Sequence, residues 1–300
     1  MTVVDLLLQF VVLLVLLGLT AWGYLRWVRP HQAQLDFQAK GLMALIVLTF
    51  AGGFLGSFFW WWDEPRSFSW DLPPLASRML ASAGWSFAVA TFLALERPTT
   101  RRMRLVLVLL ATYLLPLVGV ALLFHLNRFD FAAPITYGFF IIAGGMSIAA
   151  VWYLLQQPVI LPDAPEDAAP PAPVVKGWLS FLAILTGLWG LALFATDNGP
   201  APQVWVWPGD LLTSRLIGVM LLTIAVGSAW SLRYGDLSRL MLAMTIMYGL
   251  DLALASLWNM FSGKPVKLSY LIVFGLIALV STFLLVRQRA VMPRAALNAS

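Results

Sequence analysis

The chain has 300 residues, of which 61% are hydrophobic and 11% charged, and its mean hydropathy is +0.85. A soluble core of this length cannot hide so much apolar surface, so we expect an integral membrane protein that uses lipid as its solvent. The formal net charge of +5 does not indicate a nucleic-acid partner, because most basic residues lie in short segments beside apolar runs.

Nine apolar runs are long enough to span about 30 Å of hydrocarbon as helices. They cover residues 4–28, 41–62, 74–96, 105–126, 134–156, 177–196, 210–231, 237–259 and 268–287. The predicted fold class is therefore all-α integral membrane, with nine transmembrane helices.

Basic residues divide unequally between the two sets of alternating loops. One set holds Arg26, Arg29, Lys40, Arg97, Arg101, Arg102, Arg104, Lys176, Arg233, Arg239, Arg287, Arg289 and Arg294. The other set holds Arg66, Arg128, Lys264 and Lys267. Because basic loops stay on the cytoplasmic side, we expect the N-terminus outside and the C-terminus in the cytoplasm of a multi-pass inner-membrane protein.

A motif at Trp70–Arg78 recurs at Trp207–Arg215, where Trp, Leu, Ser and Arg repeat at one fixed offset. Further matches pair Thr49 with Thr186 and Gly53 with Gly190 and, once two residues are dropped, Arg104 with Arg239 and Tyr113 with Tyr248. We predict an internal duplication, with both halves entering the membrane from the same side because each has an even number of helices. The predicted units are a leading helix and loop (1–40), two parallel four-helix repeats (41–156 and 177–290), a Pro-rich cytoplasmic linker (157–176) and a tail (291–300).

Two local patterns predict how these units are joined. The linker is rich in proline and acidic residues, so we expect an extended, solvated strap. Glycines at 52 and 56, 144 and 145, and 187 and 190 predict faces where helices pack closely.

The outer loops are rich in tryptophan. One loop holds Trp60, Trp61, Trp62 and Trp70, and its counterpart holds Trp205 and Trp207. Such indoles are typical of an aromatic belt at the headgroup level, and a carbohydrate or quaternary-amine site is the alternative.

Three charged residues inside apolar spans are the strongest site candidates: Arg78, Arg215 and Asp251. Helix rise places Arg215 and Asp251 at similar depths, so an ion pair between them is one interpretation, with Arg78 reaching out to lipid phosphate. The functional alternative is that Arg78 and Arg215 present cationic donors to an anionic ligand, with Asp251 tuning them.

His125 and Asn259 lie near the outer ends of corresponding helices and could add polar contacts to the same layer. A histidine beside Asn127 and Arg128 at a helix end is more often solvated. We count both His125 and Asn259 as ligand-binding candidates.

The chain offers little for catalysis or cofactors. It has no cysteine, and the topology separates its two histidines, His31 and His125, so they cannot jointly bind haem or zinc. Glycine-rich phosphate loops and paired facing acids are also missing from the sequence. We expect no cofactor, no metal and no catalytic residue, and an enzyme is the least favoured class.

The segment Trp70–Arg78 matches W-x-L-x-P-L-x-[AS]-R at every fixed position. It resembles a helix-opening motif in uncharacterised multipass membrane proteins of bacteria such as actinobacteria and Chloroflexi-type organisms. The second copy departs from the motif at Gly209 and Leu211. The resemblance implies a bacterial inner-membrane protein and carries no particular activity.

Two functions of different classes fit these features. In the first, the protein binds or transports a small anionic or amphiphilic molecule at the seam between its repeats. In the second, it is a non-catalytic accessory subunit of a larger membrane complex. The expected partners are membrane lipids and either heterologous membrane subunits or further copies of this chain.

Overall fold

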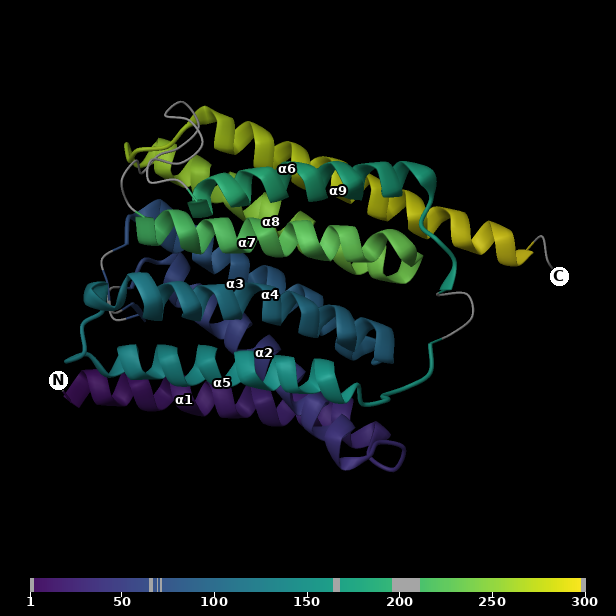
Figure 1. Ribbon diagram of the computed structural model, residues 1–300, viewed down its shortest axis with the longest axis horizontal. Coiled ribbons are helices and arrows are strands. Elements are labelled where there is room, and N and C mark those ends of the chain that lie inside the picture. The colour runs from purple at the N-terminus through teal and green to yellow at the C-terminus, as the bar shows by residue number, and fades with distance from the viewer. Residues whose placement is uncertain are drawn as a thin grey trace.

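Nine helices, each long and apolar enough to cross a membrane, make up most of the described chain (Figure 1). They are α1 (Val3–Gly23), α2 (Phe37–Trp61), α3 (Pro74–Glu96), α4 (Thr100–Phe124), α5 (Pro134–Gln156), α6 (Pro173–Ala195), α7 (Leu211–Trp230), α8 (Gly235–Phe261) and α9 (Leu268–Leu297). The computed structural model describes residues 3–64, 67, 68, 70, 72–163, 168–195 and 211–297, with only the backbone of 3–9 and 289–297. Within these residues the predicted all-helical architecture with nine candidate spans is confirmed.

Parts of several predictions lie outside the described residues. They are Arg66, Asp71, Trp205, Trp207 and Asp210, together with residues 164–167 of the linker.

Polar capping residues start some helices earlier than hydropathy alone predicts. The backbone N–H of Ala39 donates to Asp36 Oδ1 at 2.7 Å, so α2 begins at Phe37 instead of residue 41. Thr99 caps α4 in the same way, accepting from the backbone N–H of Arg102 at 3.4 Å. The polar first turns of these helices carry no hydropathy signal, which explains the difference.

Consecutive helices run in opposite directions, so the connections fall alternately at the two ends of the bundle (Figure 1). One end, here called the arginine-rich end, holds the α1–α2, α3–α4, α5–α6 and α7–α8 connections. The other end, here called the tryptophan-rich end, holds the α2–α3, α4–α5 and α8–α9 connections, together with the end of α6 and the start of α7. The basic residues predicted to share one side of the membrane are thus gathered at one end.

Four helices form the centre of the bundle. Helices α3, α7 and α8 are mostly buried and half of the α4 span is buried, whereas at most 28% of the spans formed by α1, α5 and α6 is buried. Helix α3 packs against α8 and α4 packs against α7, while α2, α5, α6 and α9 pack outside α3, α4, α7 and α8, respectively. Contacts between far-apart parts of the chain therefore run mainly through two pairs of central helices.

Glycines allow α2 to approach α3 and α6 to approach α7 closely, at the predicted Gly190 in α6 but at Gly53 in place of the predicted Gly52 and Gly56 in α2. An ideal Cβ on Gly53 would lie 2.8 Å from the carbonyl oxygen of Gly84, and one on Gly190 would lie 2.8 Å from that of Gly218. By contrast, a Cβ on Gly52 would meet nothing within 4 Å. The small-residue pattern correctly marked α2 and α6 as close-packed, but Gly52, Gly56, Gly144 and Gly145 do not make the contacts.

The described parts of the linker are fixed to the helix starts and are not solvated throughout, contrary to the prediction of a solvated strap. Ile160 is buried, and its backbone N–H donates to Thr100 Oγ1 at 3.0 Å. The backbone N–H of Thr100 donates to the carbonyl of Leu161 at 3.2 Å, and that of Gly235 donates to the carbonyl of Ala169 at 2.7 Å. The linker therefore ties the start of α4 to the start of α8.

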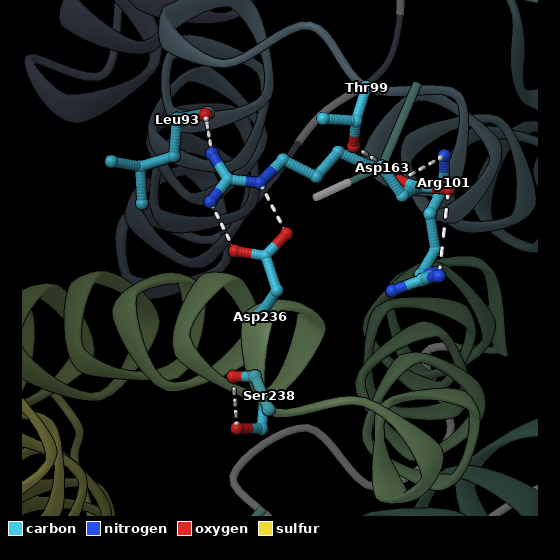
Figure 2. A network of polar contacts seen from close by, with 8 residues as sticks. Leu93, Thr99, Arg101, Asp163, Asp236 and Ser238 are labelled. Carbon is cyan, nitrogen blue, oxygen red and sulfur yellow. Dashed lines mark hydrogen bonds and ion pairs between the residues drawn. The ribbon is translucent and has the colours of Figure 1, made fainter. Parts of the chain in front are cut away.

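A buried ion pair joins the same two helix starts. The Arg102 Nε–H donates to Asp236 Oδ2 at 2.6 Å, Nη2–H donates to Asp236 Oδ1, and Nη1–H donates to the Leu93 carbonyl at 2.8 Å. Figure 2 shows Asp236 facing this guanidinium, with Leu93 of α3 on its other side. Beside it, Arg101 pairs with Asp163 of the linker at 3.6 Å and lies over the ring of Tyr234. The sequence predicts both arginines only as loop charges and gives no prediction for Asp236.

We expect Asp236→Asn to lower the free energy of unfolding by about 3–5 kcal/mol, because it leaves the Arg102 cation buried without a counter-ion. Arg26→Gln is the matched control, since Arg26 forms an exposed pair with Glu96 and such pairs contribute at most about 1 kcal/mol. The measurement is denaturant unfolding of the purified chain in detergent. Equal stability of the two variants would refute the stabilising role of the Arg102–Asp236 ion pair.

We expect Gly53→Ala to destabilise the chain by about 1–3 kcal/mol, because the added methyl group overlaps the Gly84 carbonyl. Gly52→Ala, one residue away, has room for its methyl group and should be neutral or slightly stabilising through helix propensity. Thermal unfolding of both variants in the same detergent separates the two results. If both behave alike, the close α2–α3 packing described above is wrong.

Candidate functional site

The five candidate residues lie in or next to the central helices, toward the tryptophan-rich end, and form three separate contacts. Arg78, Asp251, Asn259 and His125 are buried, and Arg215 is half-buried. Arg78 bonds with Asn259, Arg215 bonds with His125, and Asp251 bonds with Ser82. His125 and Asn259 therefore do add polar contacts to the arginine layer.

The first turn of α3 fixes the position of Arg78. Pro74 opens the helix, and the Ser77 hydroxyl donates to the Trp60 carbonyl at 2.5 Å, which fixes the first turn against the end of α2. The Arg78 side chain then turns back along its own helix, where Nη1–H donates to the Pro74 carbonyl at 3.3 Å. The same nitrogen donates to Asn259 Oδ1 of α8 at 3.0 Å.

Arg78 does not reach out to the lipid headgroups, contrary to one of the interpretations above. Its side chain is only 4% exposed, because α8 covers it. Asn259, which holds it, is fixed in turn by an Nδ2–H bond to the Pro265 carbonyl at 3.2 Å. The α8–α9 connection therefore supports the arginine from the far side.

Indole rings flank the Arg78 guanidinium. Its Cζ lies 6.0 Å from the ring centroid of Trp61 and 5.7 Å from that of Trp258, which is 43% exposed. Cations over indole faces gain electrostatic stabilisation in apolar surroundings. The sequence predicts Trp61 as part of an aromatic belt. Trp258 is not among the predicted residues, although it directly precedes the candidate Asn259.

One edge of the Arg78 guanidinium, formed by Nε and Nη2, makes no hydrogen bond within the described chain. Nε has no hydrogen-bond partner although it is buried, and both hydrogen bonds of Arg78 within the described chain use Nη1. Asp63 interacts with this guanidinium electrostatically. The edge formed by Nε and Nη2 is the one that Arg102 uses to grip the Asp236 carboxylate. Arg78 thus presents the donor pair that fits a carboxylate, sulfate or phosphate group.

Arg215 has more of its donors occupied. Its Nη1 lies 2.9 Å from His125 Nε2, its Nε–H donates to the Phe194 carbonyl at 3.3 Å, and its Cζ lies over the Phe124 ring. Because a guanidinium only donates, His125 Nε2 is the acceptor in this contact. His125 is thus buried and bonded, so its interpretation as a solvated end residue is wrong.

The predicted ion pair between Arg215 and Asp251 is also wrong. Asp251 Oδ2 lies 2.5 Å from the hydroxyl of Ser82 on α3, and Arg215 faces the end of α4. Similar depth along two helices does not bring side chains together when α8 packs against α3 and only slightly against α7. Ser82 was missed, although it lies one turn after Arg78 on the same helix face.

The tryptophans divide between lipid-facing and inward-packed positions. Trp62 is 65% exposed, as expected of an aromatic belt. Trp70, the first residue of the repeated motif, packs against Phe129 and Phe139 with ring centroids 4.9 and 5.7 Å away. The motif residue therefore anchors the α2–α3 connection onto the α4–α5 side.

Among the described residues, no group of three His, Cys, Asp or Glu side chains is placed to hold a metal ion. The described geometry therefore offers a buried arginine whose Nε has no hydrogen-bond partner, which lies between two indole rings and donates to the side-chain amide of Asn259. Comparison of the chain with protein-family models, with curated proteins and with solved structures finds no match.

Proposed function

We propose that this chain is a membrane protein that binds a small anionic or amphiphilic molecule through Arg78, as a step in moving that molecule across or along the membrane. The observation that carries the proposal is the buried Arg78 Nε–H, which has no hydrogen-bond acceptor among the described residues. A buried donor without a partner costs about 1–3 kcal/mol, and more for a charged group. An oxyanion at this edge removes that cost.

The surroundings of Arg78 favour a ligand with both a charged and an apolar part. Trp61 and Trp258 provide apolar ring faces beside the guanidinium, and Trp258 connects this position with the exposed surface of α8. An amphiphile can place its acidic group on Arg78 and its apolar part against the indoles. Arg215 has fewer free donors, so we assign it a supporting role.

We infer that the central helices belong to two parallel four-helix repeats related by an axis along the membrane normal. The crosswise packing supports this inference, since α3 contacts α8 in the way that α7 contacts α4. The polar contacts follow the same pattern: Arg78 meets Asn259 at the end of α8, and Arg215 meets His125 at the end of α4. Duplicated transporters bind substrates at such seams, an analogy of architecture only.

We further propose that the arginine-rich end faces the cytoplasm of a bacterium and the tryptophan-rich end faces outward. The unequal distribution of Lys and Arg supports this orientation. The N-terminus would then lie outside and the C-terminus inside, in the inner membrane.

The orientation can be tested directly because the chain contains no cysteine. We expect a membrane-impermeant maleimide to label Asn127→Cys, in the α4–α5 connection, on intact cells. Gln32→Cys, in the α1–α2 connection, should be labelled only after the cells are permeabilised. Both residues are exposed, so access to each thiol depends on the membrane alone. The reverse labelling pattern would overturn the orientation.

We expect Arg78→Gln to weaken anion binding by at least about tenfold, because a hydrogen bond to a charged group contributes roughly 1.5–3 kcal/mol. Arg78→Lys should also bind weakly, since an ammonium group lacks the paired donors. The measurement uses the purified chain in phosphatidylcholine nanodiscs and two probes, inorganic sulfate and added phosphatidylglycerol. Preference for one probe distinguishes a free anion from a lipid headgroup.

Arg128→Gln is the control, because it removes an exposed cation at the same end of the bundle. Unchanged binding in Arg78→Gln, or binding of neither probe to the unaltered chain, would refute the site. If the chain then purifies only with heterologous membrane subunits, the accessory-subunit alternative takes its place.

A further inference from the structure

Asp251 is a buried carboxyl group whose surroundings contain no cation bonded to it. It is 3% exposed in the middle of α8, and among the described ion pairs none includes it. Its hydrogen-bond partner is the hydroxyl of Ser82 on α3. An ionised carboxylate in such surroundings is costly unless a cation or several donors compensate it.

Counting hydrogens around Ser82 shows how this contact is made. Ser82 Oγ lies 2.5 Å from Asp251 Oδ2 and 2.8 Å from the carbonyl oxygen of Arg78. A hydroxyl has one hydrogen to donate, and a carbonyl can only accept. If Ser82 donates to the Arg78 carbonyl, the short contact to Asp251 needs a second hydrogen, which a protonated Asp251 supplies.

If Asp251 is ionised, the Ser82 hydrogen must turn to the carboxylate and leave the Arg78 carbonyl. The two protonation states of Asp251 therefore differ in whether the Ser82 hydroxyl donates to the Arg78 carbonyl or to Asp251. With Asp251 protonated, both contacts of Ser82 Oγ are hydrogen bonds, whereas with Asp251 ionised only the contact to the carboxylate is one.

We propose that Asp251 is a proton-binding site and that its proton binds together with the anion at Arg78. The first part stands on the Ser82 geometry alone, and the second rests on the proposed function. Asp251 precedes Asn259, the partner of Arg78, by about two helical turns, or ~12 Å. An anion at Arg78 and an ionised Asp251 repel each other, so a bound anion favours the protonated form of Asp251, and protonation of Asp251 favours anion binding.

Other titratable groups around this part of α8 do not replace Asp251. Tyr248 of α8 is its neighbour, with Tyr113 of α4 and Tyr270 of α9 close to that phenol. On α3 the charged group is Arg78, which bonds with Asn259. On α7 it is Arg215, which bonds with His125 of the α4 end. Of these groups, His125 is the second residue that can take up a proton in the ordinary pH range, so it needs its own control.

The test measures binding of sulfate and of phosphatidylglycerol from about pH 5 to about pH 9, a range in which both probes keep their charge. For the unaltered chain we expect affinity to rise about tenfold on acidification, the ratio that Coulomb's law gives for unit charges ~12 Å apart at an effective dielectric constant of about 20. Asp251→Asn should bind as tightly as the acidified chain at every pH. His125→Gln should keep the pH dependence.

A second readout does not need the anion. Infrared difference spectra of the unaltered chain against Asp251→Asn should contain the carbonyl band of a protonated carboxyl group near neutral pH. Ser82→Ala should shift that band, because the carboxyl group loses its acceptor. Absence of the band would overturn the proton site even if anions bind.

The outcomes separate the two proposals. If neither probe binds but the carboxyl band is present, the proposed function fails and the proton site stands. If the probes bind with the same affinity at all pH values, the coupling of proton and anion is refuted. If the pH dependence disappears in His125→Gln and persists in Asp251→Asn, the proton is bound by the histidine, and the proposal is overturned.

Discussion

A guanidinium among apolar helices has to find its hydrogen-bond acceptors within the chain, because lipid offers none. Arg102 meets this requirement completely, with Asp236 on one edge and the Leu93 carbonyl on the other. Arg78 meets it with Nη1 only, and its Nε is left without a partner. The contrast between two buried arginines of one chain, and not burial alone, distinguishes the candidate site from a structural ion pair.

The saturated arginine and the open one lie at opposite ends of the same central helices. Arg102 holds the start of α4 to the start of α8, and the linker crosses the same place. This fixes one end of the bundle by buried charge and backbone hydrogen bonds. At the other end, the side-chain hydrogen bonds between α3 and α8 are the single ones of Arg78 with Asn259 and of Ser82 with Asp251, and these are the bonds that the proposed anion and proton would change.

The sequence predicted the number and type of the helices because length and hydropathy dictate which segments can lie in lipid. It predicted less well which residues meet. Gly52 and Gly53 are equally plausible in the sequence, yet only Gly53 faces another backbone. Asp251 and Arg215 agree in depth, but the rotation of α8 turns Asp251 toward α3. Rise along a helix follows from counting residues, whereas the direction of a side chain depends on how neighbouring helices pack.

The surroundings of Arg78 and Arg215, which correspond in the proposed duplication, are not equivalent. At the repeat offset, Ser82 corresponds to Val219 and Asp251 to Pro116. Val219 is buried in an apolar cluster with Leu117. In the proposed duplication the α4–α7 seam therefore lacks both the hydroxyl and the acid that the α3–α8 seam has. Without them, the arginine of that seam is occupied by His125 and a backbone carbonyl, and it holds the bundle while the α3–α8 seam keeps the open donors.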